Sequence, residues 1–284
     1  MDLCQPSVIK FLMEDAGIHF RKEFGQNFLI KREIPERIAD ECADDTGRMI
    51  LEIGPGIGSL TKELCLRYEK VVAVEIDKGL LPILDKTLAD FDNATVINAD
   101  VMDLDLPALI DRYAEGRPVS VAANLPYYIT TPILMRLIES GIKFDSITVM
   151  VQKEVAARLV APAGSADYGA ITAVLGYYGK VRRLFTVPAG CFMPAPKVDS
   201  AVVRIDLYKE TPYRPKDEKL FFLTIKAAFE QRRKTLENAL LARLPYPREK
   251  VAEAIKAAGL PDKVRGERLS TADFVRLSDE LSLL

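Results

Sequence analysis

Short apolar runs alternate with amphipathic stretches through the first half of the chain. Runs of this length, between turns, are typical of buried strands, and the intervening stretches carry the 3.6-residue period of helices. The predicted strands are residues 49–53, 71–75, 95–99, 119–123 and 147–151. The predicted helices between them are residues 59–67, 78–89, 106–113 and 131–139. This alternation predicts an α/β fold with a parallel sheet covered by helices on both faces.

The pattern changes on either side of this block. Two helices are predicted before it, at 7–16 and 31–45, and after residue 161 come a helix and two late strands, at 169–178, 181–187 and 198–207. From residue 216 onward only helical patterns remain, and they are interrupted by proline and glycine. We therefore predict two domains, a larger α/β domain over 1–208 and a small all-helical domain over 209–284.

The composition narrows the class of protein. About half of the 284 residues are hydrophobic and 28% are charged, which is ordinary for a globular protein. No apolar run reaches the roughly 20 residues of a membrane helix, and the first ten residues do not resemble a secretory signal. The four cysteines are scattered and His19 is the only histidine, so neither a metal site nor a Ser-His-Asp triad is expected. A reducing cytoplasm is the expected compartment.

The net charge of −2 argues against a nucleic-acid partner only until its distribution is considered. Residues 206–284 carry 16 Lys and Arg against 13 Asp and Glu, so this part of the chain is positive and the remainder is negative. Contact with phosphates depends on such local excess more than on the total.

A glycine-rich turn follows the first strand of the alternating block. The segment 52–58 reads E-I-G-P-G-I-G, where glycines let the backbone approach a ligand closely. The spacing differs from the G-x-G-x-x-G of dinucleotide-binding folds, and the chain contains no phosphate-binding P-loop motif. A tight strand-to-helix connection without a ligand is the alternative interpretation.

Acidic residues at the next two strand ends favour a ligand site. Glu75 lies 21 residues after Gly54 and can accept hydrogen bonds from ribose hydroxyls, and Asp100 can accept one from an adenine amine. Each alone could be a surface charge. In succession they converge on the carboxyl edge of the sheet, where open α/β folds bind ligands. These residues resemble the Class I methyltransferase fold, which implies a seven-stranded sheet whose last strand is antiparallel.

The fourth strand ends in the tetrad N-L-P-Y at 124–127, which suits the methylation of an exocyclic amine. Such an amine is a poor nucleophile because its lone pair is delocalised into the ring. The side-chain oxygen of Asn124 and the backbone carbonyl of Leu125 could accept its hydrogens, and Tyr127 offers a face for an extruded base. The alternative is a plain proline turn. No side-chain base is required, so catalysis would rest on orientation.

A second aromatic residue lies in the proline-stiffened loop 190–196. Phe192 could cover the other face of the base, or it could be an ordinary core residue.

Together these residues resemble the ribosomal RNA adenine N6-dimethyltransferases. The matching segments are 24–29, 52–58, 124–127, 152–156, 192–200 and 229–236. The segments G-Q-N-F-L and F-E-Q-R-R-K-T-L are the most specific of them. The resemblance implies a methyltransferase that uses S-adenosylmethionine, with a small helical domain that binds ribosomal RNA.

The resemblance also implies roles for individual residues. Asn27, Leu29 and Gly54 would border the methionine part of the cofactor, Glu75 would hold its ribose and Asp100 its adenine. Asn124 would contact both cofactor and target, with Tyr127 and Phe192 sandwiching the target base. The residues expected to contact RNA are Lys22, Lys153, Arg158, Arg232, Arg233 and Lys234.

The implied reaction is the dimethylation of two adjacent adenosines near the 3′ end of small-subunit ribosomal RNA. The substrate would be a pre-ribosomal particle and the enzyme a monomer, with a role in small-subunit biogenesis. Two alternatives remain. Resistance enzymes that methylate one adenine of large-subunit RNA share the N-terminal motifs, although segment 265–270 resembles the small-subunit group. A ribosome-assembly or transcription factor that binds without catalysis is the other.

Overall fold

A computed structural model describes residues 1–18 and 26–284, and their contacts divide the chain into two compact units. The first unit comprises Met1–Ala156 and Arg182–Leu207, and the second comprises Ala157–Val181 and Tyr208–Leu284. Among the described residues, no helix is long and apolar enough to cross a membrane.

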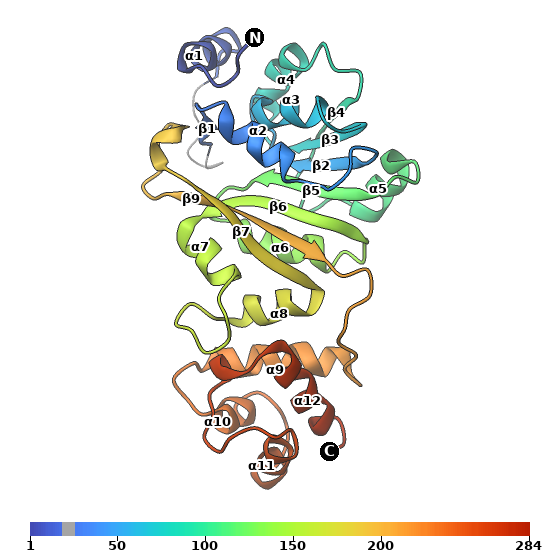
Figure 1. The fold of residues 1–284 in the computed structure, drawn as a ribbon, viewed down its shortest axis with the longest axis vertical. Helices are drawn as coiled ribbons and strands as arrows, with labels where there is room; N and C mark the ends of the chain where they lie inside the picture. The colour runs from blue at the N-terminus through green and yellow to red at the C-terminus, as the bar shows by residue number, and fades with distance from the viewer. Residues whose placement is uncertain (19–25) are drawn as a thin grey trace. The chain divides into compact units, whose positions relative to one another are not determined.

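A mixed sheet forms the centre of the first unit (Figure 1). Within the described ranges its seven strands lie in the order β4-β3-β2-β5-β6-β9-β7. Pairing is parallel from β4 to β6, and β9 runs antiparallel to β6. These strands are β2 (Met49–Ile53), β3 (Lys70–Glu75), β4 (Ala94–Asn98), β5 (Val119–Asn124), β6 (Phe144–Gln152), β7 (Gly179–Val187) and β9 (Ser200–Leu207). The expected α/β class and the antiparallel last strand are confirmed.

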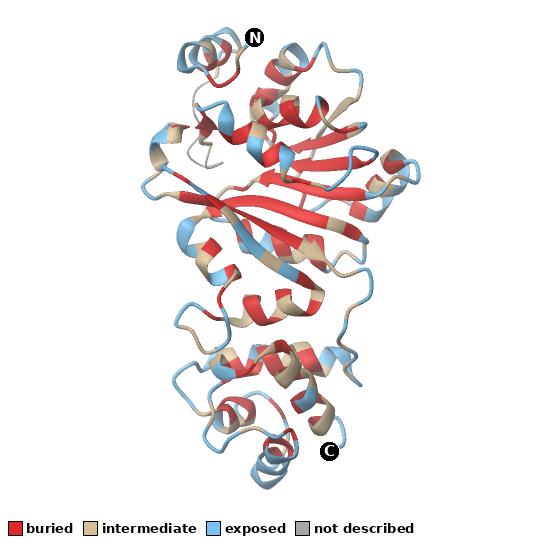
Figure 2. Cartoon of the chain, in the orientation of Figure 1, coloured by how far each residue is buried: buried red, intermediate tan, exposed pale blue. Residues whose placement is uncertain are grey.

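The strands at the centre of the sheet are largely buried because helices cover both faces of a parallel sheet. Every residue of β2 is buried, and Figure 2 shows the same burial along its neighbours. Ile38 and Leu64, from the helices α2 and α3, are fully buried in one core cluster with strand residues such as Ile50. The helices of this part of the chain are α1 (Pro6–Asp15), α2 (Glu33–Asp40), α3 (Ser59–Cys65), η2 (Lys78–Leu80), α4 (Leu81–Thr87), α5 (Leu106–Ala114), α6 (Thr130–Ile138), α7 (Lys153–Leu159) and η3 (Ala189–Cys191).

Two features of the structure were not predicted. Residues 153–159 form the helix α7. The short strands β1 (Phe28–Leu29) and β8 (Phe192–Met193) pair antiparallel, so that Leu29 lies opposite Phe192. This pairing brings together two segments that are more than 160 residues apart in the sequence.

The second unit is helical and has a hydrophobic core of its own. Phe221 and Phe274 are fully buried in that core, and Tyr168, Ala173 and Tyr177 belong to the same cluster. The phenol of Tyr168 donates a hydrogen bond of 2.8 Å to the carbonyl of Leu269. The helices are α8 (Ala170–Tyr178), α9 (Glu218–Glu230), α10 (Leu236–Leu241), α11 (Arg248–Ala257), η4 (Gly266–Arg268) and α12 (Thr271–Leu281).

The sequence pattern predicted one division of the chain, after residue 208, whereas the chain enters the second unit twice. Residues 157–181 belong to it because their aromatic side chains pack with the C-terminal helices. No local pattern in 157–181 indicates which core those side chains join.

Candidate active site

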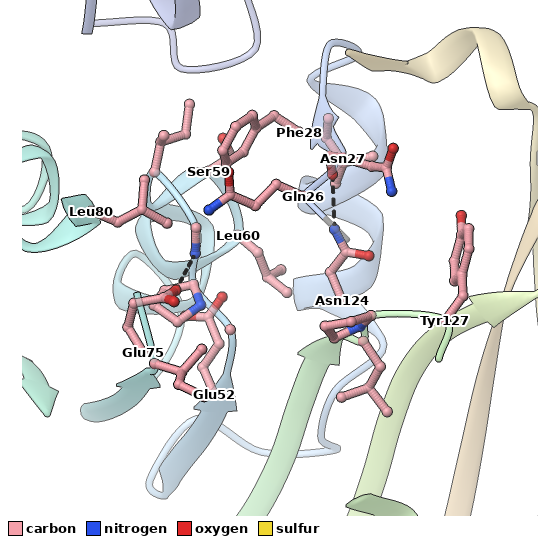
Figure 3. Close-up of a pocket in the computed structure, with 18 residues that line it drawn as sticks. Gln26, Asn27, Phe28, Glu52, Ser59, Leu60, Glu75, Leu80, Asn124 and Tyr127 are labelled. Atoms are coloured by element: carbon pink, nitrogen blue, oxygen red, sulfur yellow. Dashed lines mark hydrogen bonds between the residues drawn. The ribbon is translucent and has the colours of Figure 1, made fainter. Parts of the chain in front are cut away.

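A cavity lies at the carboxyl ends of β2, β3 and β5 (Figure 3). Strand ends, the glycine-rich turn and the segment before β1 all contribute to its wall. The residues that line it are 26–29, Glu52, 54–57, Ser59, Leu60, Glu75, Ile76, Leu80 and 124–127. The predicted site residues Asn27, Leu29, Gly54, Glu75 and 124–127 therefore share one cavity.

The glycine-rich turn requires glycine at its centre. Gly56 has a φ of +62°, and a Cβ on this residue would lie 3.1 Å from the ring of Phe28. Left-handed backbone of this kind is strained for residues with a side chain. The turn can therefore pass directly beneath the segment that contains β1, and it leaves the backbone of 54–56 facing the cavity.

Glu75 is held rigidly at the end of β3. Its two carboxylate oxygens accept hydrogen bonds from the backbone N–H of Asp77, at 2.8 Å, and from that of Gly56, at 3.2 Å. The side chain is buried, and this burial raises its pKa above the ordinary value. The bonds fix the carboxyl group, whose remaining lone pairs can accept from a ligand.

Asn124 lies between the Glu75 side of the cavity and Tyr127 (Figure 3). Its side-chain nitrogen donates to the carbonyl of Asn27 at 3.3 Å. Within the described part of the chain its side-chain oxygen accepts no hydrogen bond, so that oxygen is available to a ligand. The neighbouring Pro126 carbonyl is already bonded to the N–H of Ile129 and to the hydroxyl of Thr130.

The ring of Tyr127 lines the cavity, and its hydroxyl lies 2.6 Å from the hydroxyl oxygen of Ser200. Burial raises the pKa of Tyr127 above its ordinary value, so the phenol is neutral at physiological pH. The residue therefore offers an uncharged aromatic face.

Asp100 and Phe192 are not among the described residues that line the cavity. Asp100 is partly exposed, and its carboxylate accepts a hydrogen bond of 2.8 Å from the backbone N–H of Met102. Phe192 is 3% exposed and packs in the core beside Leu29, because the β1–β8 pairing holds it there. In this conformation the ring is a core residue, and its expected role as a cover for the base stays a prediction.

A family model described as "Ribosomal RNA adenine dimethylase" matches residues 17–283. The chain belongs to this family. A "Ribosomal RNA small subunit methyltransferase A" of Lachnoclostridium phytofermentans is 46% identical over 92% of this chain and 91% of the relative. The protein of the same name from Geobacillus thermodenitrificans is 45% identical over 99% of this chain and 97% of the relative. The family resemblance inferred from the sequence is confirmed.

Solved structures agree on the fold. A 23S rRNA methyltransferase, ErmE, superposes with a TM-score of 0.70 at 27% identity, covering 90% of this chain and all of the other. A dimethyladenosine transferase from Plasmodium falciparum gives a TM-score of 0.74 at 24% identity, covering 88% of this chain and 95% of the other. The fold of the chain is therefore that of the Class I methyltransferases.

Gln26, Glu52 and Ile76 are among the residues that line the cavity of this dimethylase but were not predicted as site residues. Gln26 donates a hydrogen bond of 2.8 Å to the buried carboxylate of Asp77. Ile76 directly follows Glu75 and is 46% exposed. The signal in the sequence that could have identified Ile76 was its position directly after an acidic residue at a strand end. Gln26 and Glu52 both lie in quoted motifs but were given no role.

The residues expected to contact RNA differ in their surroundings. Lys153 and Arg158 are exposed at the start and near the end of α7, and Arg233 and Lys234 are exposed after α9. Arg232 instead donates hydrogen bonds to the carbonyls of Ala166 and Tyr168, at 2.9 and 3.1 Å. Lys22 lies outside the described residues, as does His19.

Across 1–18 and 26–284, no group of three or more histidine, cysteine or acidic side chains could hold a metal ion.

Glu52 is a buried carboxyl group on a central strand. It is 1% exposed, and one of its oxygens has no hydrogen-bond partner in the described part of the chain. Burial, reinforced by the nearby charge of Glu75, raises its pKa to about 8. The native protein therefore holds this proton at pH 7, whereas the unfolded chain has lost it.

We expect Glu52→Gln to stabilise the protein increasingly as the pH rises. Below the pKa of Glu52 in the unfolded chain, the carboxyl is protonated in both states and its raised native pKa costs no stability. As the pH rises from there toward the native pKa of about 8, only the unfolded chain loses the proton, so Glu52 destabilises the folded protein more and more. The gain in unfolding free energy should increase by roughly 3–4 kcal/mol between pH 5 and pH 8 and then level off. Urea denaturation of both proteins across this range measures it.

Leu51→Ala is the matched control, because Leu51 is a fully buried neighbour on β2 that does not titrate. Its loss of stability should be equal at pH 5 and pH 8. A Glu52→Gln effect that is also independent of pH would contradict the assignment of a neutral Glu52.

Proposed function

We propose that this dimethylase transfers methyl groups from S-adenosylmethionine to the N6 atoms of two adjacent adenosines near the 3′ end of small-subunit ribosomal RNA. The observation that carries the proposal is the single cavity in which the glycine turn and Glu75 lie beside Asn124 and Tyr127. A nucleoside donor and an adenine amine can both be held there. The names and 45–46% identities of the two relatives support the small-subunit substrate.

The charges around the cavity fit this methyl donor. Glu75 contributes an acidic side chain, Glu52 is protonated, and no Lys or Arg is found among the described residues that line the wall. Such a wall is poorly suited to phosphates and well suited to a cation. When bound, S-adenosylmethionine supplies a methyl group on a positively charged sulfur.

Individual residues can divide the donor among them. The carboxylate of Glu75 can accept from the ribose hydroxyls, and Asp100 can accept from the adenine amine. Ile76 presents exposed apolar surface beside Glu75 for a face of that adenine. Asn27, Leu29 and Gly54 would border the methionine part, where the glycine turn allows close approach of the backbone.

The tetrad can activate the target amine by orientation. The free side-chain oxygen of Asn124 and the carbonyl of Leu125 would accept the two amine hydrogens, which favours a pyramidal and more nucleophilic nitrogen. Tyr127 would stack on the extruded base, with Phe192 on the other face only if its ring leaves the core. The methylated nitrogen can lose its proton to solvent, so no side-chain base is needed.

Asn124→Ala should abolish methyl transfer while binding to the ribosomal particle is preserved. Loss of the acceptor removes the alignment of the amine, so we expect kcat to fall at least about 100-fold. Single-turnover transfer of labelled methyl groups measures the rate, and calorimetry with S-adenosylhomocysteine and particle co-sedimentation measure binding. Full activity of this variant would contradict the mechanism. If wild type and variant bind equally and neither methylates, a ribosome-assembly factor is the better interpretation.

The second unit, with Arg233 and Lys234, is proposed to contact RNA phosphates. The slope of log binding constant against log salt concentration, for binding to the particle, should become shallower by somewhat less than one in Arg233→Ala and in Lys234→Ala. Neither substitution should lower the stability of the protein. Arg232→Ala should lower the unfolding free energy by about 0.5–1 kcal/mol, because two backbone carbonyls lose their donor and one of them, that of the exposed Ala166, can bond to water instead. Lys250→Ala, on the exposed face of α11, is the control. Equal salt slopes for all four variants would argue against this surface.

The RNA substrate is tested by supplying labelled S-adenosylmethionine with undermethylated small subunits and, separately, with large subunits. The large subunit is a fair alternative because ErmE, a 23S rRNA methyltransferase, shares the fold at 27% identity. We expect label in small-subunit RNA at two adjacent dimethyladenosines. Label in large-subunit RNA would overturn the assignment. The proposed setting is a pre-ribosomal particle in the cytoplasm, with the enzyme acting as a monomer in small-subunit biogenesis.

A further inference from the structure

The ring of Tyr127 is held from outside the cavity. The ring itself lines the cavity, while its hydroxyl forms a hydrogen bond of 2.6 Å with Ser200, which is 73 residues away in the sequence (Figure 3 shows Tyr127). The proposed stacking role uses only the aromatic face. The hydroxyl and its partner have no part in that mechanism.

Ser200 is a fixed point in the first unit. It is fully buried and begins β9, where it pairs with Gln152, the last residue of β6. The preceding Asp199 is tied on two sides, because its carbonyl accepts from the N–H of Lys153 at 3.0 Å and its carboxylate from the N–H of Ala189, also at 3.0 Å. The serine hydroxyl therefore has little freedom to move.

Tyr127 has no such support from its own backbone. It lies in the turn between β5 and α6, outside any helix or strand. A tyrosine ring is oriented by two side-chain torsions, and a bond at the far end of the ring restricts both of them. Stacking on a base depends on the plane of the ring, and methyl transfer depends on where that plane places the amine.

We propose that Ser200 is a positioning residue for methyl transfer, which holds the ring of Tyr127 in the plane on which the target adenine stacks. The inference rests on the proposed function. It extends the site to a residue that contacts neither cofactor nor substrate and acts only through Tyr127.

The competing explanation is that the bond merely satisfies a buried hydroxyl and stabilises the fold. The two differ in what Tyr127→Phe does. This variant keeps the stacking ring but removes the hydroxyl that bonds to Ser200. It should therefore reproduce the effect of Ser200→Ala on methyl transfer only if the hydrogen bond matters for transfer. Tyr128 provides a matched control, because the residue is 64% exposed and its hydroxyl has no hydrogen-bond partner in the described ranges.

The experiment compares Tyr127→Phe, Ser200→Ala, the double variant and Tyr128→Phe in the full chain. The measurements are kcat/KM for undermethylated small subunits, affinity for S-adenosylhomocysteine and the thermal midpoint. We expect each single variant to lower kcat/KM by about 3- to 10-fold, which is the usual effect of losing one hydrogen bond. The double variant should be no worse than either single one, and cofactor affinity should stay within about twofold.

Wild-type kcat/KM in Tyr127→Phe would overturn the proposal, even if Ser200→Ala folds poorly. Multiplied losses in the double variant, or a loss in Tyr128→Phe as large as that in Tyr127→Phe, would overturn it as well. If the wild-type protein methylates a different adenine-containing RNA, the small-subunit assignment fails, and the same comparison on that RNA still tests the role of Ser200.

Discussion

The parallel register of β2 with its two neighbours determines the geometry of the site. Ile53, the last residue of β2, is paired with Val74 on β3 and with Ala123 on β5. The next residue of each strand is therefore brought to the same level of the sheet, and these residues are Gly54, Glu75 and Asn124. A slip of one residue in either pairing would turn a side chain to the opposite face and separate the groups proposed to hold the methyl donor from those proposed to hold the target. The full burial of β2 makes such a slip costly.

This constraint explains which parts of the site could be predicted from sequence. Strand ends are local signals, so Glu75 and Asn124 could be placed together without knowing any long-range contact. The bond from Tyr127 to Ser200 and the pairing of Leu29 with Phe192 depend on segments that meet only in the folded chain. The same limit applies to residues 157–181. Their sequence pattern predicts a helix, but it does not indicate which hydrophobic core their aromatic side chains join. The role of Arg232 could not be predicted for the same reason, because a run of cationic residues does not show that one of them bonds to backbone carbonyls.

The cavity concentrates buried carboxyl groups, and their burial lowers the stability of the folded protein. Glu52 is buried with an oxygen that no described residue satisfies, and both Glu75 and Asp77 are buried close by. The protein retains a proton on Glu52 to limit this penalty. Stability lost at a site is commonly tied to function, because the same groups gain favourable interactions when a complementary ligand arrives. A positively charged nucleoside is complementary here, and a phosphate-rich cofactor is not.

The side of the cavity that we propose to hold the target base follows a different physical principle, which suits repeated transfer to one nitrogen. Its polar groups are an amide and a neutral phenol whose hydroxyl is already bonded. Neither needs to change its protonation during methylation, since an amine that has gained a methyl group becomes acidic enough to release its proton to water. A site with a side-chain base would have to lose that proton before a second transfer to the same amine. A site that works by orientation is ready again as soon as the donor is replaced, and this property is what a dimethylating enzyme requires.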